Sequence, residues 1–129
     1  MKKIVFIGLG IVVLLMIVFG VLAFININEA TQKILSEEIK DISFQEVDDG
    51  VYRGAFYSGD LGITVIVTVD NGEIINIDYE NHLNGKGTPA ESIKEGIIEE
   101  QSIIIDDISG ATISSRCIKL AIMNAFEGE

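Results

Sequence analysis

The longest hydrophobic stretch of the chain lies at its N-terminus. Residues 4–25 carry no charge, and apart from three glycines every one of these 22 residues is apolar. A helix of this length rises about 33 Å, which is enough to cross a hydrocarbon core of about 30 Å. Lys2 and Lys3 precede the stretch, and Glu29, Glu37 and Glu38 follow it. The positive-inside rule therefore predicts an N-terminal transmembrane anchor over residues 1–28, with the remainder of the chain outside the cytoplasm.

The alternative for this stretch is a cleaved signal peptide. The apolar part of a signal peptide is usually 7–15 residues long and is followed by small residues at the cleavage site. The stretch here is longer, and no clear pair of small residues precedes Asn26. We therefore favour an uncleaved, single-pass anchor in the cell membrane, with an extracytoplasmic C-terminal domain.

Beyond the anchor, residues 29–47 begin with a helical pattern and become acidic, which predicts a stalk and linker. The pattern then changes to the alternation of apolar and polar residues that is typical of strands. Short turns separate the alternating segments, and the second turn contains Asn71-Gly72, a strong hairpin signal. We expect an antiparallel β-meander with strands over residues 50–58, 61–69 and 73–79.

The segment after the meander favours helices. Residues 82–87 form a glycine-bearing loop, and the sequence Thr88-Pro89-Ala90-Glu91 is a capping box that opens a helix ending near Glu100. Residues 103–105 are expected to be extended, and residues 106–112 to be a loop. Apolar residues recur at helical spacing from Ile113 onward. The predicted fold class is α+β, a meander with helices packed on one face after one transmembrane helix.

The composition of the chain excludes several classes of partner and site. The chain is 48% hydrophobic with a net charge of −11, but without the anchor it is only about 40% hydrophobic, which is normal for a globular domain. The seven basic and 20 acidic residues after Asn28 give that part a charge of −13, which argues against a nucleic-acid partner. A single Cys and a single His exclude an internal disulfide and a Cys-only or poly-His metal site.

One segment combines small and hydroxyl-bearing residues directly before the last helix. It contains Ser109, Gly110, Ala111 and Thr112. The free N–H groups and positive dipole end of a helix form a seat for phosphate, and small residues let a ligand approach the backbone closely. The alternative is that Ser109 or Thr112 only caps the helix.

The same segment resembles the flavinylation motif of the FMN-binding domain family. The match reads Asp106-x-x-Ser109-Gly110-Ala111-Thr112-x-Ser114-Ser115. The resemblance extends over residues 48–126, so the FMN-binding domain is expected over residues 48–129. This domain also occurs in subunits of sodium-pumping NADH:quinone oxidoreductases and of related ion pumps.

The resemblance implies a cofactor and a partner. In the family, FMN is attached through its phosphate to the motif threonine as a phosphoester, which corresponds to Thr112 here. A separate flavin transferase makes the bond, using FAD and Mg²⁺ and releasing AMP. The other motif positions, implied as cofactor-binding residues, are Asp106, Ser109, Gly110, Ala111, Ser114 and Ser115.

The expected function is that of a membrane-anchored, extracytoplasmic electron carrier rather than an enzyme. The chain has only the minimal domain on one anchor, so membership of a pump complex is not expected. The alternatives are an anchored ligand- or partner-binding module without flavin, and a small flavin reductase.

Several residues have two interpretations. His82 is either a cofactor contact or an exposed loop residue, and Lys86 and Lys94 either neutralise the phosphate or are solvated. Four aromatic residues are candidate neighbours of the flavin ring, although core positions are favoured for them. Cys117 is expected to be a buried structural thiol. The four aromatic residues are Tyr52, Phe56, Tyr57 and Tyr79.

Overall fold

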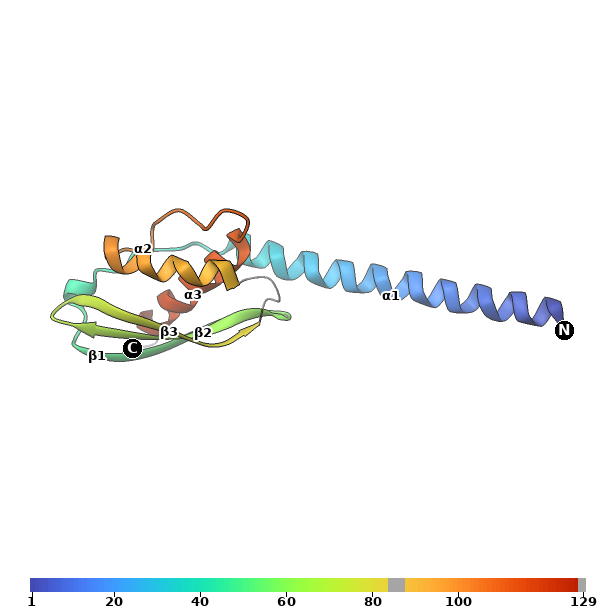
Figure 1. The fold of residues 1–129 in the computed structure, drawn as a ribbon, viewed down its shortest axis with the longest axis horizontal. Coiled ribbons are helices and arrows are strands. Elements are labelled where there is room, and N and C mark those ends of the chain that lie inside the picture. Colours follow the sequence, from blue (N-terminus) through green and yellow to red (C-terminus); the bar gives the residue numbers. More distant parts are fainter. Residues whose placement is uncertain (84–87, 128–129) are drawn as a thin grey trace.

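The computed structural model describes residues 1–83 and 88–127, and the side chains of residues 81–83, 88 and 89 also lie outside the described part. The N-terminal helix α1 (Lys2–Ser36) projects from one end of an α+β domain as a long rod (Figure 1). Its apolar window has a mean hydropathy of 3.2, so α1 is long and apolar enough to cross a membrane. The helix continues beyond the apolar stretch, and Ala30 and Ile34 in its last turns are buried against the domain.

The meander predicted from the alternation is present. Its strands pair antiparallel in the order β1-β2-β3, and Asn71 and Gly72 connect the last two with φ values of 51° and 75°. The third strand is longer than predicted because its backbone continues the ladder, with Leu83 opposite Gly62. His82 therefore belongs to the end of a strand and not to a loop. The strands are β1 (Gly50–Ser58), β2 (Leu61–Asp70) and β3 (Glu73–Leu83).

A bulge interrupts the alternation in β3. Thr68 pairs with Asn76 and Val69 pairs with Ile74, so Ile75 has no opposite residue. The extra residue lets both Ile74 and Ile77 point into the core, while Ile75 is exposed.

The side chain of Gln101 fixes this bulge from the outside. Its Oε1 accepts the Ile74 N–H at 2.8 Å, and its Nε2 donates to the Ile74 carbonyl at 2.9 Å. Gln101 is also the C-cap residue of the helix α2 (Ile93–Glu100), and its backbone is left-handed, with a φ of 51°. The end of that helix and the bulge are therefore held together.

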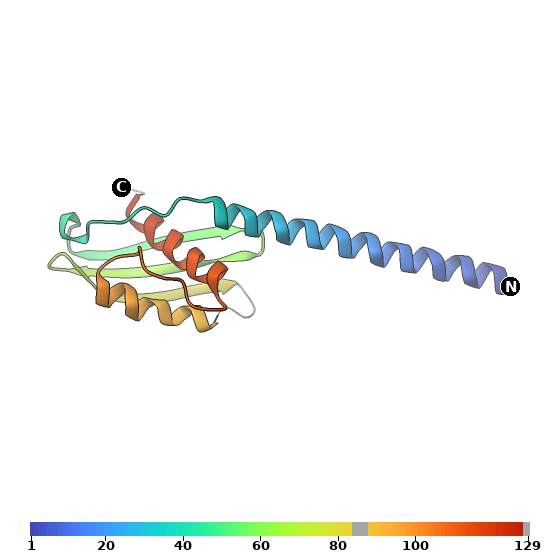
Figure 2. The same cartoon turned by 90° about the horizontal axis from the view of Figure 1, so that it is seen from above.

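The helices cover one face of the sheet, as predicted (Figures 1 and 2). The predicted capping box instead begins a 3₁₀ turn, η2 (Thr88–Ser92), and α2 (Ile93–Glu100) follows it with Ser92 as N-cap. The tighter turn takes up the residues around Pro89, so the α-helical hydrogen bonds start later than expected. The last helix is α3 (Thr112–Glu127), which starts one residue before the prediction. Residues 103–105 belong to no strand.

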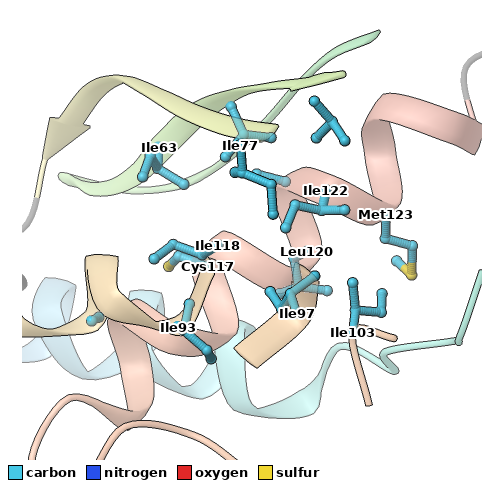
Figure 3. Close-up of a cluster of buried hydrophobic side chains, with 14 of the residues drawn as sticks. Ile63, Ile77, Ile93, Ile97, Ile103, Cys117, Ile118, Leu120, Ile122 and Met123 are labelled. Atoms are coloured by element: carbon cyan, nitrogen blue, oxygen red, sulfur yellow. The ribbon is translucent and has the colours of Figure 1, made fainter. Parts of the chain in front are cut away.

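The core lies between the sheet and the two helices (Figure 3). Ile63 and Ile77 from the strands, and Ile93, Ile97 and Ile118 from α2 and α3, are buried in this layer. The predicted apolar stripe of α3 is buried throughout. It consists of Cys117, Ile118, Ala121, Ile122 and Ala125.

Residues 29–47 contribute to the same core. Ile34 from α1 and Phe44 from the short helix η1 (Phe44–Glu46) are both buried in it. The segment expected to be a stalk and linker therefore packs on the domain, although the boundary at residue 48 stays a prediction.

Candidate functional site

The predicted attachment segment forms a loop that leads into α3. We call residues 105–111 the motif loop. It ends at Thr112, the first residue of α3, at the end of the domain where α1 joins it (Figures 1 and 2). Thr112 is exposed, as are Ser109 and Gly110, whereas Ala111 is buried. The segment thus presents its threonine to solvent.

A tight turn sets the position of Thr112. The Ala111 N–H donates to the Ile108 carbonyl at 2.9 Å, and the Ala111 carbonyl accepts the first helical bond from Ser115 N–H at 2.9 Å. Gly110 has a φ of +78°, which strongly favours glycine. A Cβ at Gly110 would meet nothing within 4 Å, so the approach to the backbone before Thr112 is open.

The hydroxyl groups of the motif divide into two classes. Ser114 and Ser115 are buried, and the Ser115 Oγ accepts a hydrogen bond from the Ile108 N–H at 3.0 Å. Ser109 and Thr112 are exposed, and within the described residues no hydrogen bond from either side chain caps α3. Ser115 therefore holds the loop, whereas Thr112 is accessible for chemistry.

The charges around Thr112 suit a phosphate. The first turn of α3 contains no acidic residue, and a helix N-terminus carries about half a positive charge. Asp107 in the motif loop is paired with the buried Lys119, whose Nζ lies 2.8 Å from Oδ1. Asp106 is exposed to solvent. The residues present therefore fit the phosphate of FMN better than they fit a cation.

The start of α3 is fastened to the end of α1. The Arg116 Nε donates to the Ile34 carbonyl at 3.2 Å, and its Nη2 donates to the Glu37 carbonyl at 2.7 Å. The last carbonyls of a helix lack partners within it and favour a cation. A second link is the Ser58 Oγ, which donates to the Ala30 carbonyl at 3.0 Å. Thr112 therefore lies at a fixed position relative to α1.

A hollow of about 400 Å³ lies beside the motif loop. Both acidic residues of the loop line it, together with Lys119, Arg116 and residues 37–39 and 103–105. Thr112 itself is not part of its lining. Within the described residues, no group of three or more His, Cys, Asp or Glu side chains gathers to hold a metal.

The other candidate residues are spread over the domain. The side chain of His82 and the whole of Lys86 lie outside the described residues. Lys94 lies over the ring of Tyr79, with Nζ 5.5 Å from its centroid. The Tyr79 hydroxyl donates to the Glu91 carbonyl at 2.7 Å, and burial raises the pKa of Tyr79 above its ordinary value. Tyr79 is therefore a packed residue under α2.

The remaining aromatic candidates also have structural contacts. Tyr52 packs on Phe126 near the C-terminal end of α3, with ring centroids 4.8 Å apart, so it lies far from Thr112. Phe56 packs against the core. The Tyr57 hydroxyl lies 2.8 Å from the Thr64 Oγ1 on the outer face of the sheet.

Cys117 is a buried thiol, as expected. Burial raises its pKa to about 11, although the charge of the neighbouring Arg116 acts in the opposite direction. A thiol with so high a pKa carries little thiolate at neutral pH, which argues against a redox role.

Comparisons with known proteins agree with the motif. The profile of the FMN-binding domain matches residues 57–127, more than half of the chain. A distant relative is the NADH:acrylate oxidoreductase of Vibrio harveyi, which is 29% identical over 112 residues. The match covers 83% of this chain and 11% of that protein, so the chain corresponds to a small part of the relative.

Proposed function

The chain belongs to the FMN-binding domain family, and from this membership we propose that it carries electrons through FMN held covalently on Thr112. The family match supports FMN as the cofactor. One observation supports the assignment of Thr112 as the attachment site. Thr112 is exposed directly after a glycine-bearing turn, and the helix that it begins has no acidic residue in its first turn. The same end of the helix attracts phosphate.

The attachment is a phosphoryl transfer in which FAD is the donor and a flavin transferase is the catalyst. The Thr112 Oγ forms a bond to the phosphorus on the flavin side of FAD. The bond from that phosphorus to the bridging oxygen breaks, AMP leaves, and the hydroxyl proton is released. Once bound, FMN supplies one- and two-electron chemistry, while the protein orients it and sets its surroundings.

We also propose that α1 anchors the domain outside the cytoplasm. The apolar stretch ends at Ile25, ten residues before Leu35, which corresponds to about 15 Å of helix. Arg116 fastens the start of α3 to this part of α1. The proposed attachment site would therefore face the membrane from a short distance.

The experiment that tests this function is co-expression of the full chain with a flavin transferase. We expect an intact mass increased by FMN minus one water, and a band that fluoresces under ultraviolet light on a denaturing gel. Expression with an inactive transferase is the control and should give neither signal. A chain that stays unmodified beside an active transferase would instead favour an anchored binding module without flavin.

Protease added to intact cells or spheroplasts tests the proposed topology. We expect cleavage after Asn28 and protection of Lys2 and Lys3, because the positive charges before the apolar stretch are retained in the cytoplasm. Immunoblotting with a tag at each end would identify the protected fragment. Recovery of a soluble domain that begins near Asn26 would show that α1 is a cleaved signal peptide.

A further inference from the structure

We propose that Lys119 is a positioning residue for the attachment of FMN, because it holds the motif loop against α3 and thereby presents Thr112 to the flavin transferase. The inference rests on the proposed function at Thr112. Lys119 lies seven residues after Thr112, about 10 Å further along α3, so it acts through the loop and not by contact with the reacting phosphorus.

The contacts of Lys119 are directed at the motif loop. Its ammonium donates to the Ile105 carbonyl and to the Asp107 Oδ1, the latter at 2.8 Å. One turn earlier on α3, the Ser115 Oγ accepts the Ile108 N–H. Ser115 and Lys119 therefore bind the motif loop at neighbouring points, directly before the turn that ends at Thr112.

The burial of Lys119 strengthens its attachment to the motif loop. The residue is only 5% exposed, and an ammonium without partners in such a place is very unfavourable. If the loop moved away from α3, the charge would lose both of its loop acceptors at once. The loop and the helix are therefore expected to move together.

The ion pair between Lys119 and Asp107 also neutralises a negative charge in the motif loop. Without Lys119, the carboxylate of Asp107 would stand unpaired beside Asp106, near the place where the phosphates of FAD arrive. Loss of Lys119 could therefore slow attachment through a loose loop or through repulsion of the donor. These two effects respond differently to neutralisation of Asp107.

The test measures the rate of covalent FMN attachment by the transferase to the full chain, followed by in-gel fluorescence at saturating FAD. We expect Lys119→Met to lower this rate by about tenfold or more, because small misplacements of a reacting group have effects of this size. Lys119→Arg should restore part of the rate. Lys94→Met is the matched control and should react like the wild type, because Lys94 belongs to α2 and lies over the ring of Tyr79.

Amide hydrogen exchange gives a readout that does not depend on flavin. In Lys119→Met we expect about tenfold faster exchange of the Ile108 and Ala111 amides, with unchanged exchange in β2. Unchanged protection of the loop would overturn the proposal even if attachment were slower. A wild type that takes up no FMN would refute the function at Thr112, whereas the exchange result would still decide whether Lys119 holds the loop.

The double variant Lys119→Met/Asp107→Asn separates position from charge. A loose loop predicts that attachment stays slow in the double variant, whereas recovery of the wild-type rate would show that charge repulsion was the cause and would overturn the positioning role. If Lys119→Met destabilises the whole domain, Asp107→Ala tests the same contact, because it removes the side-chain acceptor that Lys119 binds in the loop. A wild-type rate of attachment to Asp107→Ala with normal protection of the loop would also overturn the proposal.

Discussion

Thr112→Val is expected to carry no covalent FMN under conditions in which the wild type is fully modified. Valine keeps the β-branched shape but lacks the hydroxyl oxygen that must bond to phosphorus. Thr112 is exposed at the first position of α3, so the fold should lose less than about 0.5 kcal/mol. Intact mass spectrometry of the full chain after reaction with FAD and the transferase measures the result.

Two variants complete this series. Thr112→Ser retains the hydroxyl and should keep part of the attachment. Ser109→Ala removes the other exposed hydroxyl group of the motif, and it should still carry covalent FMN because it retains the Thr112 hydroxyl. An adduct that persists in Thr112→Val and maps to Ser109 would contradict the assignment, whereas Ser114 and Ser115 are buried and poor acceptors.

The strands were predictable because local pattern and turn chemistry agree along the meander. The alternation over residues 50–79 and the Asn71-Gly72 turn determine both the order and the antiparallel pairing of β1, β2 and β3. The bulge at Ile75 was not predictable in the same way. It depends on Gln101, which lies far along the chain and binds the backbone of Ile74. Phe44 was missed because the apolar residues around it, Ile42 and Val47, alternate irregularly with acidic and polar ones and show no helix or strand period.

The site was predictable only in part. The motif located Thr112 and its loop, since glycine and hydroxyl residues before a helix form a local signal. Lys119 left no such signal, because lysine is ordinarily exposed and its burial arises from contacts with Ile105 and Asp107 in the folded loop. The buried position of Ser115 likewise depends on the way that loop folds back on α3.

The packing of α3 on the sheet depends on one glycine. Gly54 in β1 lies directly beneath α3, and a Cβ added there would lie 2.2 Å from the Ala121 carbonyl oxygen and 2.4 Å from the Ala125 nitrogen. Both atoms belong to the backbone, so no side-chain rotation can relieve the clash. The φ of Gly54 is not positive, which means that space and not backbone conformation requires glycine at this position.

Gly54→Ala is therefore expected to destabilise the domain by about 2 kcal/mol or more, which lowers the midpoint of thermal unfolding by about 10 °C. Thermal unfolding of the flavin-free chain in detergent, followed by circular dichroism, measures the change. Gly96→Ala on α2 is the matched control. Its added Cβ would meet only the Ile105 Cδ1, at 3.0 Å, and this end of a flexible side chain can move. Alanine also favours a helix over glycine by about 1 kcal/mol, so Gly96→Ala should unfold at or above the wild-type temperature. If both variants unfolded at the same temperature, α3 would pack less closely on β1 than the distances at Gly54 require.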